Sequence, residues 1–450
     1  MRAPLAPLAL AAALGPLTAC AVDDATTADV QEQQEGPALA YDEYTVLFTN
    51  PLCKRYLYGP DQAVVSESGA KLEGKPRGAW CTPGDAAASA ARPESPQAKL
   101  VSWIDDPEVN ELFFAYFTMS NAAVTTAVCR AIEERDVQVT MVLDQGSDLT
   151  RANQIAACKP ASGDPARAPR LLLRGGEGGI ALQHNKIFML NPHGERPRFV
   201  FSSGNLTSGV VLHHENWHFI APKAETFFAK AHLCLAEGLE SHASSKSAYS
   251  SFIRDCKART GLKEERDLKA YFIPGEGDRA FSGLQRMLQG AEAVDVAAHR
   301  FTHKGLVALL KGRLTAGAPV RLVADDDLHW ATKGQVVGGN DAVDAAKVAE
   351  LLPLGLDARY VETNHVDKLL HHNKFVIASQ PGDAPDQVFA GSGNFTGSGF
   401  SDNFENYYVV SIPEVVETFH AQYDHLADVL ATRPADLPTE LVVPSGGTEP

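Results

Sequence analysis

The stretch Gln183-His184-Asn185-Lys186-Ile187-Phe188 is followed by Ser203-Gly204-Asn205-Leu206-Thr207 and then by Glu215-Asn216-Trp217. The same order returns later as His371-His372-Asn373-Lys374-Phe375-Val376, Ser392-Gly393-Asn394-Phe395-Thr396 and Glu405-Asn406-Tyr407. The histidine and the asparagine are 21 residues apart in the first copy and 22 in the second, and the asparagine and the glutamate are 10 and 11 apart. Matching order and spacing of several polar residues indicate a tandem duplication.

The same pattern of secondary structure precedes each copy. Apolar residues recur at helical spacing within 121–135 and then alternate, as in a strand, over 137–143, up to Asp144. In the second half, helical spacing over 306–314 is followed by an apolar strand over 320–324, up to Asp325. Both aspartates are interpreted either as cleft residues or as turn or cap residues. A helix followed by an apolar strand is typical of α/β folds, so the sequence predicts two tandem α/β domains.

The repeated polar residues are expected on a three-stranded arrangement. Each His-x-Lys lies in an alternating apolar segment, and residues i and i+2 of a strand share a face. A turn-rich segment follows, at 191–194 and 380–383, and return strands are predicted at 199–201 and 388–390. This hairpin brings the serine and asparagine back beside the His-x-Lys pair. A third strand starting at Glu215 or Glu405 is expected to place a carboxylate against an imidazole.

These residue types suit the chemistry of phosphate esters. A neutral imidazole is a competent nucleophile towards phosphorus, and a second one can act as general acid. Lysines, serines and asparagines supply donors for the negative charge, and a glutamate can fix the tautomer of each histidine. No metal and no cofactor is required. The predicted catalytic residues are His184, Lys186, Asn205, Glu215, His372, Lys374, Asn394 and Glu405, with Ser203 and Ser392 as substrate-binding residues.

The two blocks resemble the paired His-x-Lys-x4-Asp and Gly-Ser-x-Asn motifs of the phospholipase D superfamily, over most of residues 41–430. The resemblance implies two halves packed about a pseudo-twofold axis, with mixed sheets flanked by helices and both motifs at one cleft. It further implies a phosphohistidine intermediate. By this similarity His184 is the nucleophile and His372 the acid and base, and the reverse order stays open.

The chain departs from the family pattern in both copies. The motif aspartate is replaced by Asn191 in one copy and Ser379 in the other, and the first Gly-Ser is Ser202-Ser203. Tyrosyl-DNA phosphodiesterases of the same superfamily also lack this aspartate and remain active. The departures therefore leave the chemistry in place but weaken an assignment to the standard phospholipase subgroup.

The first twenty residues read as a signal peptide. Arg2 precedes the short apolar stretch Leu5–Leu17, and Leu17-Thr18-Ala19-Cys20 resembles a bacterial lipobox, which implies lipidation at Cys20. An ordinary cleaved signal peptide is the alternative. We expect an exported protein held on a bacterial membrane, with Ala21 favouring the outer membrane where there is one. The predicted organisation is 1–20 signal peptide, 21–40 flexible acidic tether, 41–260 first half, 261–430 second half and 431–450 disordered tail.

Six further cysteines are an even number in a chain with an export signal, which indicates disulfides. Pairing of neighbours is the simplest of the roughly 15 connectivities that six cysteines allow. A zinc site is the weaker alternative, because no Cys-x-x-Cys occurs. The expected pairs are Cys53 with Cys81, Cys129 with Cys158, and Cys234 with Cys256.

The net charge of -16 argues against a nucleic-acid-binding protein, although a basic cleft can lie inside an acidic protein. The leading hypothesis is therefore a monomeric phospholipase D-like enzyme that hydrolyses phospholipid headgroups. A nuclease with the same site and a non-catalytic envelope protein are the alternatives. His213, His214 and His371 have no histidine counterpart at the same place in the other copy and are interpreted as cleft-rim or solvated residues, with a role in zinc binding as the weaker alternative. Trp217 and Tyr407 are expected in the core.

Overall fold

The computed structural model describes residues 40–57, 64–65, 71–73, 77–81, 83–332, 341–363 and 369–437. The predicted signal peptide with Cys20, the tether up to residue 39 and the tail from residue 438 lie outside these described residues. Within the described ranges, no helix combines the length and the apolar character needed to cross a membrane.

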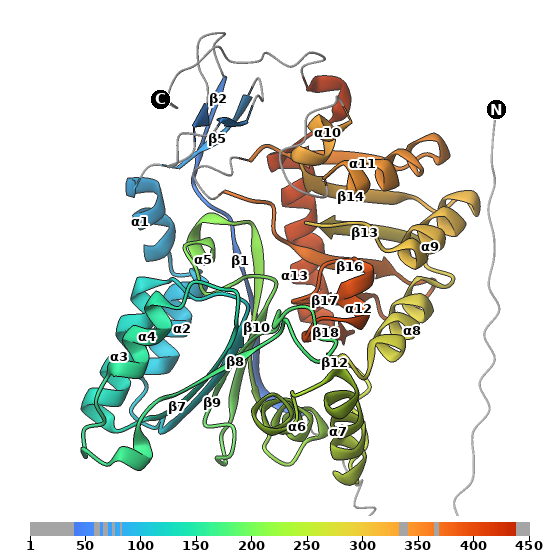
Figure 1. Cartoon of the computed structure of the whole chain (residues 1–450). Coiled ribbons are helices and arrows are strands. Elements are labelled where there is room, and N and C mark those ends of the chain that lie inside the picture. The colour runs from blue at the N-terminus through green and yellow to red at the C-terminus, as the bar shows by residue number, and fades with distance from the viewer. Residues whose placement is uncertain are drawn as a thin grey trace, which may run out of the picture. The chain divides into compact units, whose positions relative to one another are not determined.

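Seven strands of the first half form one mixed sheet (Figure 1). Its strands lie in the order β1-β11-β10-β9-β6-β7-β8. Strands β6, β7 and β8 are parallel, and the others pair antiparallel. Their bounds are β1 Tyr41–Thr49, β6 Glu111–Tyr116, β7 Gln138–Asp144, β8 Arg170–Arg174, β9 Lys186–Leu190, β10 Arg198–Ser202 and β11 Glu215–Pro222.

The second half repeats this sheet and adds one short strand, in the order β12-β18-β17-β16-β13-β14-β15-β19. Strands β13, β14 and β15 are again parallel. The predicted α/β fold of two tandem domains with mixed sheets is confirmed. The bounds are β12 Leu268–Ile273, β13 Ala293–Ala298, β14 Val320–Asp325, β15 Asp357–Val361, β16 Lys374–Ser379, β17 Gln387–Gly391, β18 Glu405–Val410 and β19 Ala431–Thr432. Two small hairpin sheets pair β2 (Lys54–Leu57) with β5 (Arg77–Trp80) and β3 (Val64–Val65) with β4 (Lys71–Glu73).

Helices cover the outer face of each sheet and fill part of the layer between the sheets. Over the first sheet lie α2 (Pro96–Asp105), α3 (Ala122–Arg135) and α4 (Thr150–Ala157); over the second lie α8 (Gly277–Leu288) and α9 (Lys304–Thr315). The central layer includes α6 (Phe227–Ser241), α7 (Lys246–Arg259) and α13 (Pro413–Asp424). Shorter helices are α1 (Pro83–Ala91), α5 (Gly209–Leu212), α10 (Asp327–Ala331), α11 (Asp341–Ala349) and α12 (Gly397–Ser401).

Alternation along the strands joins the two halves through a shared core. In β9, Ile187 and Met189 belong to the central core, whereas Phe188 and Leu190 face the outer helices. Strand β16 divides its residues in the same way, as expected for a strand covered on both faces. The rings of Phe201 and Tyr408 stack with centroids 3.6 Å apart, so the inner faces of the two sheets contact each other directly.

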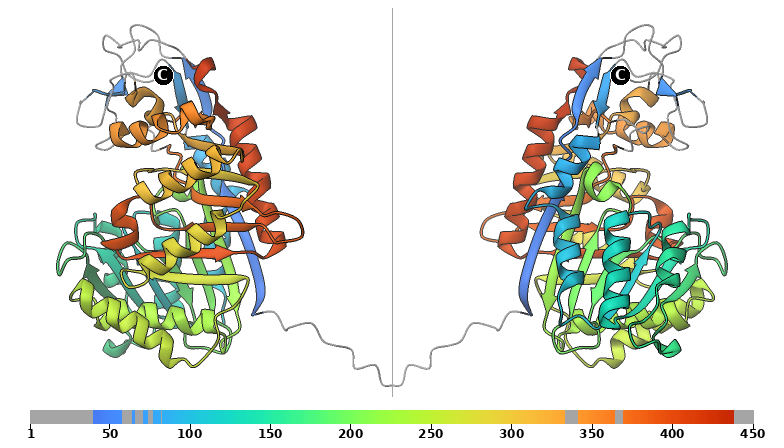
Figure 2. Two further views of the ribbon diagram at one scale, coloured as in Figure 1. Left: turned by 90° about the vertical axis from the view of Figure 1, so that its right-hand side faces the viewer. Right: turned by 90° about the vertical axis from the view of Figure 1, so that its left-hand side faces the viewer.

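Helix α13 of the second half also packs beside β1 of the first half, as the red helix next to the blue strand in Figure 2. The rings of Phe48 and Phe419 meet edge to face with centroids 5.1 Å apart, an arrangement that aromatic pairs favour. The halves therefore bury apolar surface against each other along two elements, which fixes the position of one motif relative to the other.

The same helix start recurs in both halves. The Asn121 side chain accepts a hydrogen bond from the N–H of Val124 at the start of α3, and the His303 side chain accepts one from the N–H of Leu306 at the start of α9. Such caps satisfy N–H groups that have no partner within the helix. The helices predicted within 121–135 and 306–314 are confirmed, as are the strands that end at Asp144 and Asp325.

All three predicted disulfides are present: Cys53–Cys81, Cys129–Cys158 and Cys234–Cys256. The start of the predicted tail differs from the expectation. Strand β19 pairs with β15, and Leu437 is buried in the core on the outer face of the second sheet. Residues 431–437 are therefore held by strand pairing and by burial of an apolar side chain. The proline in this segment had favoured the prediction of a disordered tail.

Candidate active site

The two His-x-Lys motifs lie where the halves meet. Strands β9 and β16 begin at Lys186 and Lys374, so each histidine precedes the strand that was expected to include it. The backbone N–H of His184 donates to the carbonyl of Phe404 (2.9 Å), and the N–H of His372 donates to the carbonyl of His214 (3.0 Å). Phe404 and His214 are the residues immediately before the two motif glutamates. The two contacts are equivalent, as a pseudo-twofold relation between the halves requires.

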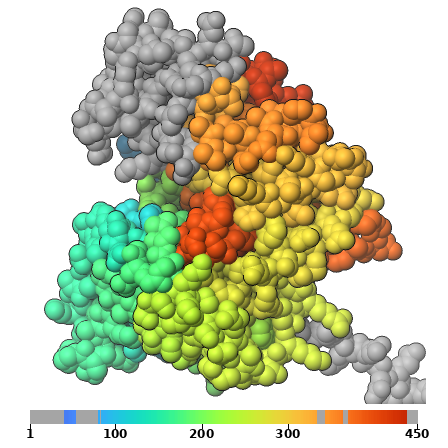
Figure 3. Space-filling view, turned by 45° about the vertical axis from the view of Figure 1, so that its right-hand side comes forward, coloured from blue at the N-terminus to red at the C-terminus, as the bar shows by residue number. Residues whose placement is uncertain are grey.

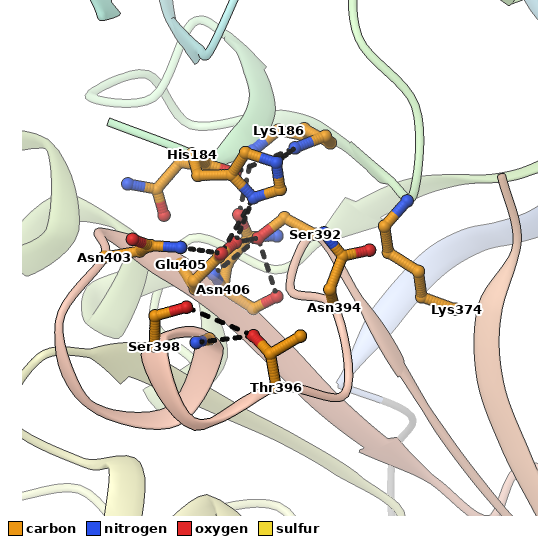
Figure 4. Close-up of polar contacts among 12 residues, drawn as sticks. His184, Lys186, Lys374, Ser392, Asn394, Thr396, Ser398, Asn403, Glu405 and Asn406 are labelled. Carbon is orange, nitrogen blue, oxygen red and sulfur yellow. Dashed lines mark hydrogen bonds and ion pairs between the residues drawn. The ribbon is translucent and has the colours of Figure 1, made fainter. Parts of the chain in front are cut away.

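Each motif histidine is hydrogen-bonded to the glutamate of the other half. The Nδ1 atom of His184 lies 2.7 Å from Glu405 Oε1 (Figure 4), and the Nδ1 atom of His372 lies 2.9 Å from Glu215 Oε1. Both glutamates are fully buried. Because an ionised carboxylate can only accept, Nδ1 carries the proton in each pair. The lone pair of a neutral imidazole is then on Nε2, the atom available for reaction.

Further donors hold the glutamates in place. Glu405 accepts from the hydroxyl of Ser392 (2.6 Å) and from the Asn403 amide (3.0 Å). Glu215 accepts from the Trp217 indole N–H (3.3 Å), and its Oε1 lies 3.1 Å from Nδ1 of His213. A Cβ atom at Gly204 would lie 1.8 Å from Glu215 Oε2. Glycine is therefore required at this position of the Ser-Gly-Asn segment.

Both motif lysines are buried and directed at the histidines. The Lys186 Nζ atom donates to the His184 carbonyl (3.0 Å) and lies 3.1 Å from His184 Nε2. The Lys374 Nζ atom donates to the carbonyls of His372 (2.8 Å) and Ser203 (3.1 Å). Burial lowers the pKa of Lys186 to about 8, although Glu405 and Glu215 oppose the change. Burial and the neighbouring Lys186 ammonium lower the pKa of Lys374 well below its usual range. Two cations so close together favour a bound anion.

The charged groups of each motif act on the histidine of the other. Burial lowers the pKa of His184, Glu405 opposes this effect, and both Lys186 and Lys374 add to it. Burial also lowers the pKa of His372 well below its usual value, and both lysines again contribute, as do His299 and His213. Each imidazole therefore lies within the field of both ammonium groups.

Trp217 and Tyr407 lie in the core, as predicted.

A cavity of about 390 Å³ opens beside His184. Residues of both halves line it, among them Leu182, Arg300, Asn394 and Ser398. In Figure 3, orange-red surface that includes α12 lies between green surface of the first half and yellow surface of the second. The side-chain oxygens of Asn205 and Asn394 are buried without a hydrogen-bond partner among the described residues. Each of these two equivalent amides thus has an acceptor oxygen that no described residue satisfies.

The chain is similar to known proteins in sequence and in fold. The model of a family described as "Cardiolipin synthase, PLD-like domain" matches residues 284–427. The solved phosphatidylserine synthase of Haemophilus influenzae Rd KW20 superposes with a TM-score of 0.56 at 11% identity, over 76% of this chain and 86% of that one. Residues 284–427 thus match a PLD-like domain, and the fold of the chain is similar to that of this synthase.

Other solved structures superpose less closely. Polyphosphate kinase from Porphyromonas gingivalis matches with a TM-score of 0.47 at 12% identity, over 76% of this chain but only 47% of the kinase. The yeast tyrosyl-DNA phosphodiesterase matches with a TM-score of 0.44 at 9% identity, over 70% of this chain and 85% of that one. No curated protein sequence matches the chain.

The superfamily motif aspartate is absent from this chain, and the structure shows what stands in its place. Asn191 follows the end of β9 opposite to Lys186 and has a positive φ of 48°, which asparagine tolerates better than most residues. Its side chain accepts from the N–H groups of Asn110 (2.9 Å) and Glu111 (3.1 Å). Ser379 occupies the equivalent end of β16. Both positions therefore lie at strand ends, away from the histidines.

Two aspartates position the two motifs, a role that the sequence left open. Asp144 Oδ2 accepts from the backbone N–H of Gln183 (2.8 Å), and Asp325 Oδ2 accepts from that of His371 (3.0 Å). Gln183 and His371 directly precede the two motif histidines. The signal in the sequence is the matching position of both aspartates at the end of a predicted strand.

The neighbouring histidines correct one expectation. His213, His214 and His371 were predicted at the cleft rim or in solvent, but all three are buried. His214 and His371 form the bridge between the halves, and His213 lies beside Glu215. The spacing of the motifs does not reveal this, because the burial arises from the contact between the halves.

Proposed function

We propose that this chain is a phospholipase D-type phosphodiesterase that hydrolyses phospholipid headgroups through a phosphohistidine intermediate. The observation that carries the proposal is the crosswise pairing of His184 with Glu405 and of His372 with Glu215 at one cleft. Two imidazoles with Nδ1 fixed and Nε2 available, beside two buried ammonium groups, supply a nucleophile, an acid and a site for a phosphodiester anion.

In the first step Nε2 of His184 attacks phosphorus, and the bond between phosphorus and the leaving alcohol breaks. His372 gives a proton from Nε2 to that alcohol. In the second step His372 takes a proton from water, which attacks the phosphohistidine and releases His184. The position of the Lys186 ammonium 3.1 Å from His184 Nε2 supports His184 as the nucleophile, because an ammonium can only donate to an unprotonated nitrogen.

The residues around the histidines stabilise the charge of the reaction. With both lysines protonated and both glutamates ionised, the charges of these four groups sum to zero. A phosphodiester then adds one negative charge, which favours the protonated state of the acid histidine. The side-chain amide N–H groups of Asn205 and Asn394 can donate, and we assign them to the non-bridging oxygens of phosphate. The Ser392 hydroxyl donates a hydrogen bond to Glu405, and the Ser203 carbonyl accepts one from the Lys374 ammonium.

The choice of phospholipid rests on three supports. The net charge of -16 disfavours the approach of a nucleic acid. The family matched by residues 284–427 is described by the name of a lipid enzyme, cardiolipin synthase. The lipobox-like sequence before Cys20 would hold the enzyme at a membrane and so raise the local concentration of lipid. We propose a monomer, exported and anchored at Cys20.

The test compares His184→Asn and His372→Asn with His193→Asn, a matched variant at an exposed histidine outside the cleft. Each protein is assayed on phospholipid vesicles and on plasmid DNA, in the presence of EDTA. We expect each cleft variant to lose at least about 10³-fold in turnover on vesicles, and His193→Asn to keep it. Acid quenching should trap a phosphohistidine in the wild type.

Four results would overturn parts of this proposal. Wild-type turnover in both cleft variants would exclude the mechanism. Cleavage of DNA without cleavage of lipid would show the nuclease. Full inhibition by EDTA would point to a metallohydrolase, and no turnover on either substrate would favour a binding protein with the same fold.

A further inference from the structure

The surroundings of the two catalytic histidines differ in spite of the duplication. His213 and Asn403 occupy equivalent positions, each two residues before a motif glutamate. His299 and Phe117 also correspond, since each follows by one residue the end of an equivalent strand, β13 or β6. The ring of His372 lies 4.7 Å from that of His299 and 5.5 Å from that of His213. The ring of His184 has Phe117 at 5.6 Å instead.

His213, Glu215 and His372 form a compact cluster of potential metal ligands. Glu215 Oε1 lies 3.1 Å from His213 Nδ1 and 2.9 Å from His372 Nδ1, and the three atoms all lie within 4.8 Å of one another. All three residues are buried, with small exposed fractions of 11% and 8% left on the two imidazoles. The exposed edge of the cluster is therefore formed by the two imidazoles.

The fold gives His213 a specific place beside the glutamate. A Cβ atom at Gly209 would lie 2.4 Å from His213 Nδ1 and 2.7 Å from its Cε1, so the absence of a side chain in α5 makes room for this ring. Trp217 binds the other oxygen of Glu215. A partner of this kind orients a carboxylate ligand and leaves one oxygen for a metal.

We infer that His213, Glu215 and His372 form an inhibitory Zn²⁺ site that captures the catalytic histidine of the second half. Two imidazoles and one carboxylate are a ligand set that zinc favours, with water at the fourth position. Zinc would bind between the three atoms that now share hydrogen bonds. This inference rests on the proposed function, because it treats His372 as the acid and base of that reaction.

The inhibition follows from the tautomer of His372. In the absence of metal, Nδ1–H donates to Glu215 and the neutral ring keeps its lone pair on Nε2. Zinc on Nδ1 displaces that proton, and the ring carries a proton on Nε2 instead, with no net change in protons. A zinc-bound ring cannot become the doubly protonated imidazolium, and its Nε2–H is a much weaker acid, so proton transfer to the leaving alcohol in the first step stops. The corresponding exchange at His213 has no effect on the reaction.

The second half provides the matched comparison. Asn403 donates to Glu405 at 3.0 Å, at the position that corresponds to His213 beside Glu215 in the first half. The variant His213→Asn therefore gives the first half the residue of the second, and Asn403→His gives the second half the residue of the first. The first variant should lose the site, and the second should create another one with His184 and Glu405.

Zinc binding is measured first, by calorimetry with Zn²⁺ alone on the full chain and both variants. We expect His213→Asn to bind one zinc ion fewer per chain, or to bind it at least tenfold more weakly, and Asn403→His to bind one more. Equal stoichiometry and affinity in wild type and His213→Asn would overturn the site. A thermal unfolding curve of each variant establishes whether it is folded. If His213→Asn does not fold, Asn403→His tests the same ligand set independently.

Inhibition is then measured on a soluble phosphodiester, with each protein compared to its own zinc-free rate. Zinc should inhibit the wild type, EDTA should restore the rate, and His213→Asn should need at least tenfold more zinc for the same inhibition. Zinc that binds without inhibiting would overturn the inhibitory role. A chain that binds zinc at His213 but turns over no phosphodiester would retain the site and disprove the proposed function instead.

Discussion

Glu405 belongs to the second half of the chain, yet it accepts its hydrogen bond from His184 of the first half, at 2.7 Å. The contact makes the site of each half incomplete by itself, because the imidazole and the carboxylate that orients it come from different copies of the repeat. The two copies of the duplicated motif thus form one interdependent site rather than two separate ones.

Replacing Glu405 with Gln should lower the pKa of His184, since the carboxylate raises it through charge and hydrogen bonding. NMR titration of the His184 imidazole measures this shift, and kcat should fall by about 10²–10⁴-fold. The exposed Glu414→Gln serves as the control. If Glu215→Gln shifted His184 and Glu405→Gln did not, the histidines would be paired within each half, contrary to the structure.

Activity should decline as the pH rises through about 8. The folded-state pKa of Lys186 is lowered to about 8, so the protonated form that binds phosphate is lost above that value. The pKa of Lys374 is lowered as well, which places the alkaline limb of the profile no higher. The profile of kcat/KM on a soluble phosphodiester reports these groups in the free enzyme. A profile that stays flat up to pH 10 would show that neither lysine charge is needed.

Gly204→Ala should reduce turnover by at least about 10²-fold, because its Cβ would displace the Glu215 carboxylate that orients His372. Gly312→Ala is the matched control: this glycine lies in helix α9, and a Cβ there meets nothing within 4 Å. It should leave turnover unchanged and stabilise the fold by about 0.5–1 kcal/mol. Equal turnover in the two variants would contradict the close packing at Gly204.

Asp144→Ala should destabilise the protein by about 1–3 kcal/mol, since it leaves the buried N–H of Gln183 without its acceptor. Turnover should fall as well, because the adjacent His184 loses a support. Denaturant unfolding and kcat are the measurements, with the exposed Asp383→Ala as the comparison. Loss of stability with unchanged kcat would restrict Asp144 to a structural role.

Much of this protein is determined by local sequence. Apolar periodicity within 121–135 and 137–143 predicted a helix and a strand, since it reports which side of each element is buried. The repeat of polar residues predicted the duplicated fold and identified the residues of the candidate site. Neighbouring cysteines predicted the disulfides, because short chain separations favour pairing.

Only the tertiary structure decided which glutamate pairs with which histidine. Spacing along the chain is the same whether His184 bonds Glu215 or Glu405, so no pattern within one copy can distinguish the two arrangements. The choice arises where the inner faces of the two sheets pack and the bridges at Phe404 and His214 form. The burial of His213 beside Glu215 has the same origin, because contacts between segments far apart in sequence are set by packing rather than by local preference.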